Sequence, residues 1–359
     1  MPGMRGFSGG LLALALIGCS AQATPPLPVH VGGRIIHNPD GSLSFGWPAI
    51  YIEGRFHGTG VTASVDTTTD RLRLLIDGTE KALLIQPGTT SLTISGLPAG
   101  DHVVRLEKLS ESQTGGARFV GFYPAEGSTA LPAPAPAGRA IEYIGDSHSV
   151  GYGDISNSRD CTGQEVHDLT DSQQAFGPVL ARRLSADYRV VAYSGFGIVR
   201  NYAGGSAGLS LPALYPRLKP DDASDLETNP GDWRPQLIVI NLGTNDFSTP
   251  LHSGEPWANA EALHADYRAK YAAFARMLMA KQPQAHLVLM GTDLFYADVQ
   301  QVAAAVDAEV PGRVLTVHVP AMEQTACHDH PSLKDQRMMA DSVRTLLDQH
   351  PEIWRAAER

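Results

Sequence analysis

The chain has 359 residues, of which 43% are hydrophobic and 18% are charged. At about 150 residues per domain this length predicts roughly two domains, and the apolar content excludes a chain that is mainly disordered. The 28 basic residues are outnumbered by 38 acidic ones, which gives a formal net charge of −10. Because the chain is acidic and has no block of lysine and arginine, we expect no nucleic-acid partner and no basic membrane-binding face.

Residues 1–18 are expected to be a signal peptide. Arg5 precedes an apolar run at 11–17, which is shorter than the ~20 residues of a membrane span but is typical of a secretory leader. The sequence Leu-Ile-Gly-Cys ending at Cys19 resembles the bacterial lipobox, so we expect cleavage before Cys19 and lipidation of that cysteine. Cleavage after Ala23 is the alternative. The protein would then be a periplasmic or outer-membrane lipoprotein, or secreted, with the lipid as its only link to a membrane.

The cysteine count agrees with export. If Cys19 is lipidated, Cys161 and Cys327 remain, an even number in a compartment where disulfides persist. A disulfide between them is predicted. Two unrelated buried thiols are the alternative.

Residues 27–125 are expected to form an all-β sandwich. Asp77-Gly78 lies between two apolar segments and predicts a tight hairpin. Residues 128–139 are rich in proline and alanine, so we expect an extended linker there. Short strands separated by Gly, Pro and Asp are predicted at 51–56, 61–65, 71–76, 81–85, 91–94, 103–109 and 119–123.

Residues 140–359 alternate between strands and helices, which predicts a parallel sheet covered by helices on both faces. In such sheets ligands bind beyond the carboxyl ends of the strands. The expected strands lie at 141–144, 190–193, 237–242, 287–290 and 314–319, and the expected helices at 172–184, 258–280, 298–308 and 333–350.

Ser147 follows the first of these strands, in the sequence Gly-Asp-Ser. A serine at a strand-to-helix turn exposes its Oγ and its own N–H at a helix N-terminus, as an acyl-transfer nucleophile requires. The alternative is an ordinary turn followed by a helix N-cap. The nucleophile elbow of α/β-hydrolases is absent, because Ser149 stands where that motif has glycine.

Three further segments after strands offer the other parts of such a site. A glycine in the segment Tyr-Ser-Gly-Phe-Gly, Gly195 or Gly197, could donate a backbone N–H to a substrate oxygen, and Asn245 could donate a side-chain amide. Asp246 is expected to fix its loop. His330, after the last strand, is the natural general base.

The cluster formed by Cys327, His328, Asp329 and His330 also allows a zinc site. Neighbouring side chains diverge on an extended chain, however, and no second ligand pair at metal spacing appears. We therefore expect neither a metal nor an organic cofactor.

Gly-Asp-Ser, Ser-Gly, Gly-Thr-Asn-Asp and His-Pro-Ser, in this order over roughly 140–350, resemble the SGNH (GDSL) hydrolase superfamily. Gly-Tyr-Gly after the first block and Tyr-Ser-Gly-Phe-Gly in the second are most similar to carbohydrate esterase family two, the acetyl xylan esterase type. The resemblance implies a jelly-roll sandwich followed by a three-layer α/β/α domain. It also implies Ser147 as nucleophile, His330 as base, and Ser147, Gly195 and Asn245 as the oxyanion hole.

One position departs from the superfamily pattern. An aspartate usually stands two or three residues before the histidine, and His328 and Cys327 occupy those positions here. Asp329 is the remaining candidate for a third triad member. Alternatively a backbone carbonyl orients the ring of His330, which would give a Ser-His dyad.

The expected function is that of an exported carbohydrate esterase that removes O-acetyl groups from an acetylated glycan. A short-chain lipid or aryl esterase and a non-catalytic glycan-binding lipoprotein are the alternatives. The aromatic residues that could stack on a sugar ring, or simply pack in the core, are Trp233, Trp257, Phe247 and Tyr296.

Overall fold

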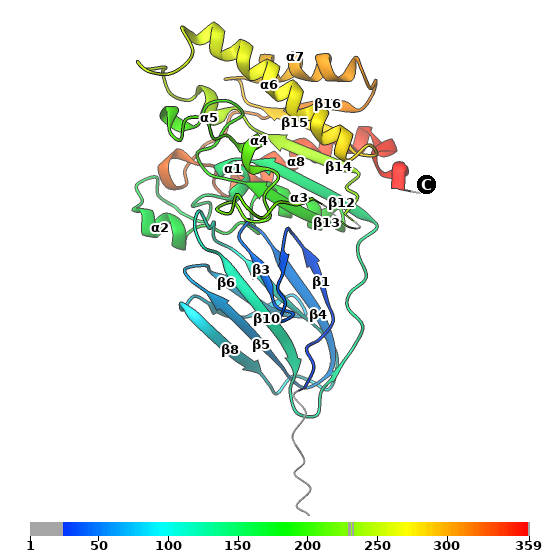
Figure 1. Ribbon diagram of the computed structural model, residues 1–359. Helices are drawn as coiled ribbons and strands as arrows, with labels where there is room; N and C mark the ends of the chain where they lie inside the picture. The colour runs from blue at the N-terminus through cyan, green and yellow to red at the C-terminus, as the bar shows by residue number, and fades with distance from the viewer. Residues whose placement is uncertain (1–23, 229–230, 232, 358–359) are drawn as a thin grey trace, which may run out of the picture.

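The computed structural model describes residues 24–228, 231 and 233–357, and consists of a β-sandwich followed by an α/β domain (Figure 1). The predicted signal peptide and the lipidation site Cys19 lie outside the described residues. Within the described part of the chain, no helix is both long and apolar enough to cross a membrane.

Two antiparallel sheets form the sandwich. All seven strands expected from the sequence are present as β4 to β10, and the Asp77-Gly78 hairpin has positive φ at both residues. One sheet contains, in spatial order, β1 (Val29–Gly32), β4 (Tyr51–Gly58), β9 (Gly100–Lys108), β6 (Leu72–Ile76) and β7 (Thr79–Leu84), with β11 (Thr129–Ala130) pairing with β4. The other contains β2 (Ile36–His37), β3 (Leu43–Phe45), β10 (Ala117–Pro124), β5 (Val61–Thr67) and β8 (Gly88–Ile94).

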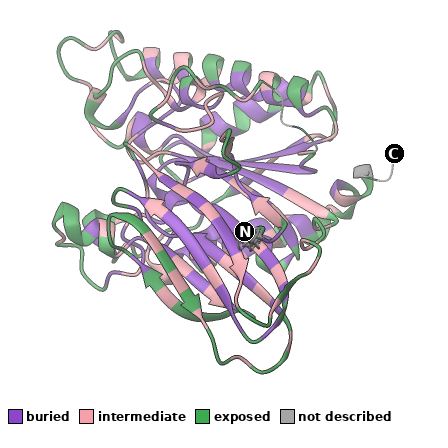
Figure 2. Ribbon diagram, turned by 60° about the horizontal axis from the view of Figure 1, so that its bottom comes forward, coloured by how far each residue is buried: buried purple, intermediate pink, exposed green. Residues whose placement is uncertain are grey.

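The α/β domain has a five-stranded parallel sheet. Its spatial order is β13 (Ala186–Ala192), β12 (Arg139–Gly145), β14 (Leu237–Asn241), β15 (His286–Gly291) and β16 (Val314–His318). Helices α3 (Phe176–Arg183) and α8 (Leu333–Gln349) pack together on one face, and α6 (Ala260–Lys281) and α7 (Tyr296–Asp307) on the other. The central strands are buried along their whole length because both faces are covered (Figure 2). The expected fold class is confirmed.

Short helices connect these elements. They are α1 (Ser147–Val150), α2 (Gly163–Asp168), α4 (Leu211–Leu214) and α5 (Thr244–Phe247), with the 3-10 turns η1 (Tyr202–Gly204), η2 (Cys327–Asp329) and η3 (Pro351–Ala357).

Strand order and register decide where a ligand can bind. The first strand, β12, has β13 on one side and β14 on the other, so the order in which strands are added changes direction at β12. Gly145 at its end pairs with both Ala192 and Asn241. The segments after these three strands therefore emerge side by side at the switch point, where ligands bind in open α/β sheets.

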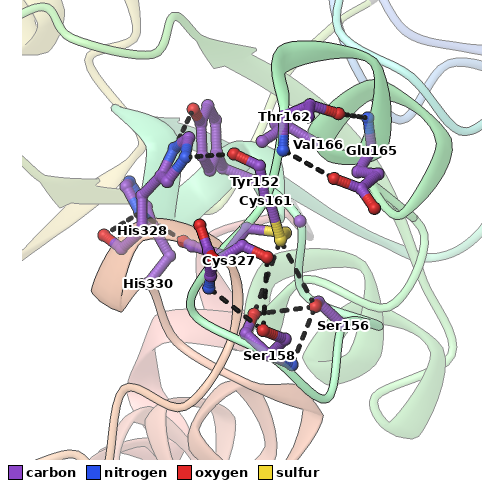
Figure 3. Close-up of a disulfide and its surroundings, with 12 residues drawn as sticks. Tyr152, Ser156, Ser158, Cys161, Thr162, Glu165, Val166, Cys327, His328 and His330 are labelled. Atoms are coloured by element: carbon purple, nitrogen blue, oxygen red, sulfur yellow. Dashed lines mark hydrogen bonds between the residues drawn. A yellow bond between two sulfur atoms is a disulfide. The ribbon is translucent and has the colours of Figure 1, made fainter.

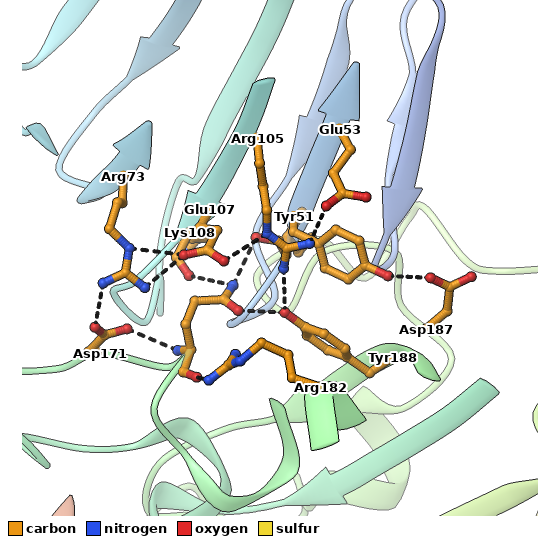
Figure 4. Close-up of polar contacts among 12 residues, drawn as sticks. Tyr51, Glu53, Arg73, Arg105, Glu107, Lys108, Asp171, Arg182, Asp187 and Tyr188 are labelled. Carbon is orange, nitrogen blue, oxygen red and sulfur yellow. Dashed lines mark hydrogen bonds and ion pairs between the residues drawn. The ribbon is translucent and has the colours of Figure 1, made fainter. Parts of the chain in front are cut away.

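The two domains meet through a polar interface, shown in Figure 4. Arg73 forms ion pairs with Glu107 of its own sheet at 2.7 Å and with Asp171 of the α/β domain at 2.8 Å. Arg105 pairs with Glu107 at 2.7 Å and donates to the Tyr188 hydroxyl at 2.8 Å. The linker expected at 128–139 overlaps two strands, because β11 covers Thr129–Ala130 and β12 begins at Arg139. Only residues 131–138 lie between strands.

Candidate active site

The structure brings Ser147 and His330 together, although 183 residues separate them. Ser147 begins α1 directly after β12, and the Asp146 side chain caps this helix by accepting the His148 N–H at 3.0 Å. His330 lies between β16 and α8. Its Nε2 is 2.9 Å from Ser147 Oγ, and Ser147 is 5% exposed. The pair is thus within the hydrogen-bond reach that a nucleophile and its base require.

Two backbone carbonyls orient the His330 ring. Nδ1 lies 3.0 Å from the carbonyl oxygens of both Cys327 and His328. Because a carbonyl can only accept, Nδ1 carries the proton and Nε2 presents its lone pair to the Ser147 hydroxyl. Burial lowers the pKa of His330, which favours the neutral base.

Asp329 does not reach the His330 ring. Its carboxylate forms an ion pair with Arg159 at 2.9 Å, and its side chain is 74% exposed. His328 and Asp329 both have left-handed backbone, with φ of 53° and 57°, in the tight turn before His330. Of the two alternatives that the sequence left open, this geometry matches the one in which backbone carbonyls orient His330, because the Asp329 carboxylate is turned to solvent and paired elsewhere.

A disulfide joins Cys161 to Cys327, with their Cα atoms 5.4 Å apart (Figure 3). It ties the segment after α1 to the turn that carries His330. The zinc alternative fails because the Cys327 sulfur is bonded and unable to bind a metal ion. In the described residues, no group of three His, Cys, Asp or Glu side chains is arranged to hold a metal.

His328 and Tyr152 are hydrogen-bonded to each other beside His330. The sequence had not predicted that either residue contacts the catalytic base. The His328 ring lies between the Cys161 carbonyl, 2.7 Å from Nε2, and the Tyr152 hydroxyl, 3.0 Å from Nδ1 (Figure 3). The Tyr152 ring also stacks on His330 with centroids 4.2 Å apart. The Gly-Tyr-Gly sequence after the nucleophile was the only sign of this contact.

Gly195 and Gly197 differ in what their N–H groups do. The Gly197 N–H donates to Asn201 Oδ1 at 3.1 Å, and a Cβ there would lie 2.2 Å from the Arg200 carbonyl. Gly195 has a φ of 83°, and a Cβ there would meet open space. Across the described chain no acceptor is found for its N–H. Gly195 is therefore the better placed of the two to donate to a ligand.

Asn245 lies in α5, directly after β14, and is buried between the two neighbouring segments. Its Nδ2 donates to the Phe196 carbonyl at 3.0 Å and to Asp146 Oδ2 at 3.3 Å. The amide thus lies between the serine and glycine segments, close to both.

Asp246 holds the loop that follows Gly197, whereas the sequence predicted only that it would fix its own loop. Its carboxylate accepts the backbone N–H groups of three consecutive residues, at 3.0, 2.8 and 2.9 Å, those of Ile198, Val199 and Arg200. Burial raises its pKa to about 6, although these hydrogen bonds favour the ionised form.

The four candidate stacking aromatics have different surroundings. Trp233 precedes β14, at the opposite edge of the sheet, and lies under Arg189. Tyr296 bonds to Thr316 and packs against a histidine. Trp257 lines a cavity of about 410 Å³. Phe247 borders two adjacent hollows, of about 440 and 360 Å³, the larger of which is also lined by His148 next to the nucleophile. Of the four, only Phe247 thus shares a hollow with a residue next to the nucleophile.

Comparison with known proteins agrees with this geometry. Residues 31–134 match the family model described as Carbohydrate esterase 2 N-terminal, and residues 141–343 match GDSL-like Lipase/Acylhydrolase. A relative from Cellvibrio japonicus, named acetylxylan esterase / glucomannan deacetylase, is 40% identical over 356 residues, covering 96% of this chain and 98% of the relative. The chain belongs to carbohydrate esterase family two.

Solved structures of other carbohydrate esterases have the same two-domain fold. One with 40% identity superposes with a TM-score of 0.86 and covers 92% of this chain and 100% of that one. A family-two enzyme from Corynascus thermopiles, solved with a carbohydrate binding domain, is 27% identical with a TM-score of 0.73, covering 89% and 99% of the two chains. The predicted resemblance to family two is confirmed.

Proposed function

We propose that this family-two carbohydrate esterase removes O-acetyl groups from the hydroxyls of a polysaccharide or oligosaccharide through an acyl-enzyme on Ser147. The distance of 2.9 Å between Ser147 Oγ and His330 Nε2 carries the proposal, because it lets the imidazole take the hydroxyl proton directly. The name of the Cellvibrio japonicus relative supports the choice of substrate class.

The reaction proceeds in two balanced steps. His330 Nε2 takes the Ser147 proton as Oγ bonds to the acetyl carbon, and the oxyanion accepts the Ser147 and Gly195 N–H groups. Asn245 joins them by exchanging its longer hydrogen bond, to Asp146 at 3.3 Å, for one to the oxyanion. His330 then gives that proton to the departing sugar oxygen, which leaves as a hydroxyl. Water attacks the acetyl-enzyme in the same way, releasing acetate and restoring the serine.

Release of acetate from a panel of acetylated glycans, measured beside short-chain and long-chain aryl esters, tests this function. We expect acetate from at least one glycan and better turnover of short than of long acyl chains. Turnover of long-chain esters without acetate release from any glycan would support the lipid or aryl esterase instead.

Ser147→Ala and His330→Ala test the two catalytic assignments. Each should abolish hydrolysis of glycan and aryl esters, because each removes one member of the reacting pair. His57→Ala, at an exposed position on β4 of the sandwich, is the matched control and should keep full activity. A folded Ser147 or His330 variant with more than about a tenth of wild-type activity would contradict the assignment.

We further propose that the protein is exported and that cleavage before Cys19 leaves a lipidated N-terminus. The leader pattern at 1–18 and the Cys161–Cys327 disulfide support this, because disulfides persist outside the cytosol. Mass spectrometry of the mature N-terminus is the test. An unmodified N-terminus at residue 24 would indicate the alternative cleavage after Ala23.

A further inference from the structure

The segment 109–116, between β9 and β10, leaves the sandwich and lies against the α/β domain. The Leu109 carbonyl accepts the Ser172 N–H at 2.9 Å, and the Gly115 N–H donates to Asp221 at 2.8 Å. Lys108, at the end of β9, is part of the domain interface in Figure 4. The interface therefore fixes both ends of this segment next to the crevice where the strands of the parallel sheet end.

Within that segment, the Glu111 side chain reaches the glycine loop of the candidate active site. Its Oε1 accepts the Ser194 N–H at 2.7 Å. Ser194 immediately precedes Gly195, the residue with the open N–H. A short N–H···O bond to a carboxylate is stronger than one between neutral groups.

The local chain geometry explains why Ser194 takes an acceptor from the other domain. Tyr193 donates its N–H to Gly145 of β12 at 3.2 Å, and the Phe196 N–H donates to the Tyr193 carbonyl at 3.2 Å, which closes a turn with Ser194 and Gly195 at its centre. The hydrogen bond of such a turn does not use the N–H groups of its two central residues. β13 is the edge strand of its sheet. Glu111 of the sandwich accepts the Ser194 N–H.

The Glu111 charge also affects the pKa of two neighbouring tyrosines. Burial, and after it the Glu111 charge, raises the pKa of both Tyr152 and Tyr193. Burial also raises the pKa of Glu111 itself. A carboxylate so close to a developing oxyanion would oppose it electrostatically, so its contribution must come from geometry rather than from charge.

We propose that Glu111 is a positioning residue for the oxyanion hole. By accepting the Ser194 N–H it fixes the peptide groups on either side of Ser194 and thereby the direction of the Gly195 N–H. This role rests on the proposed acyl-enzyme function, in which Gly195 donates to the oxyanion. The sandwich domain thus completes the catalytic site of the other domain through one side chain.

Three substitutions of Glu111 in the full chain distinguish the effect of its side-chain length from the effect of its negative charge. Glu111→Gln keeps an acceptor oxygen at the same distance, so kcat should stay within about threefold of wild type. Glu111→Asp keeps the charge but withdraws the carboxylate by about one C–C bond, roughly 1.5 Å. Glu111→Ala removes the acceptor. For both the Asp and Ala variants kcat should fall by about ten- to a hundredfold, less than the ~10² to 10³ lost with an oxyanion donor itself.

The loss should appear in kcat on both a glycan and an aryl acetate, with KM changed by less than about threefold, because only the transition state uses the Gly195 N–H. Thr114→Ala, in the same segment and exposed, is the matched control and should behave as wild type. Circular dichroism and the melting temperature report folding. If the Ala variant does not fold, comparison of the Asp and Gln variants still tests the positioning role of Glu111.

Unchanged kcat in both the Asp and Ala variants would overturn the proposal, as would a loss confined to KM, which would mark a substrate contact. An active Asp variant beside an inactive Gln variant would show that charge matters instead of reach. These outcomes are read against an active wild type. A wild type without esterase activity on any acetyl ester would overturn the proposed function itself, which distinguishes the two failures.

Discussion

Substitution of Asp329 tests which groups orient the His330 ring. Removing a true triad aspartate costs about 10⁴ in turnover, because it leaves the imidazole in the wrong tautomer. The Asp329 carboxylate pairs with Arg159, and two carbonyls hold His330 Nδ1. Asp329→Asn should therefore lower kcat by about tenfold or less. A loss of about three powers of ten in the folded variant would restore Asp329 as the acid of a full triad.

The acid limb of the pH profile of kcat/KM should lie below the ordinary pKa of histidine. The reaction needs neutral His330, and burial lowers the pKa of this group, so protonation requires a lower pH than the usual value of about 6.5. We therefore expect the midpoint of the acid limb of kcat/KM to lie below the ordinary histidine value of about 6.5. Measurement from about pH 4 to 8 on the folded enzyme checks this.

Asp146 titrates in the same range and needs its own control. Burial raises the pKa of Asp146 to about 7, whereas burial and His330 lower that of His148 to about 3. If His330 governs the acid limb, Asp146→Asn should leave its midpoint unchanged. A limb centred at or above pH 6.5, or one that vanishes in this variant, would contradict the assignment.

Local sequence located candidate residues in the segments that follow strands and missed those that come from elsewhere. Ser147, Asn245 and His330 could be located because each lies in a short motif beyond the carboxyl end of a strand. Glu111 lies in a different domain from Ser194, so only the folded chain reveals their contact. For Asp329 the sequence left a triad and a dyad open, because the left-handed backbone at His328 and Asp329 cannot be read from the residue pattern.

Among the secondary-structure elements, the turn before His330 should depend on the disulfide for its conformation. Cys327 bonds to Cys161 and also supplies one of the carbonyls that orient the imidazole. Reduction should loosen this turn and lower kcat before the protein unfolds. A misplacement of about 1 Å can cost about a hundredfold, so we expect a loss of about ten- to a hundredfold.

Activity, thiol titration and circular dichroism measured together over a reductant series check this expectation. Reoxidation is the control and should restore activity. Full activity with both thiols free would contradict the positioning role of the disulfide.

The same scale shows which strands a sequence can reveal. β4 to β10 were predictable because apolar segments alternate with turn residues, as at Asp77-Gly78. β1, β2, β3 and β11 have only two to four residues each. Such segments are too short to show a period, and their strand geometry comes from pairing with longer partners. This is also why the linker appeared longer than it is.

At the scale of the whole molecule, the division into two domains was predictable and their interface was not. Arg73 and Arg105 alternate with apolar residues along β6 and β9, a pattern typical of solvent-facing positions. In the structure these arginines face the α/β domain and share Glu107 between them (Figure 4). Pairing with a distant domain leaves no trace in local periodicity.

Arg105→Met should therefore destabilise the whole protein. Glu107 is 6% exposed in its side chain, Arg105 is 17% exposed, and the two neighbouring arginines hold the pKa of Glu107 below its usual value against the effect of burial. Removing one partner of a buried ion pair costs about 3 to 5 kcal/mol, because the other charge stays behind. Arg73 still pairs with Glu107, so we expect about 3 kcal/mol.

Arg118→Met is the matched control for this last prediction. Arg118 also lies in the sandwich and pairs with two aspartates, but its side chain is 37% exposed, so its loss should cost at most about 1 kcal/mol. Urea unfolding at about pH 7 and with the disulfide intact compares the two variants. If Arg105→Met cost no more than Arg118→Met, the interface would contribute little to stability. A larger cost, with both domains still unfolding in one transition, would show that the sandwich and the α/β domain fold as one unit.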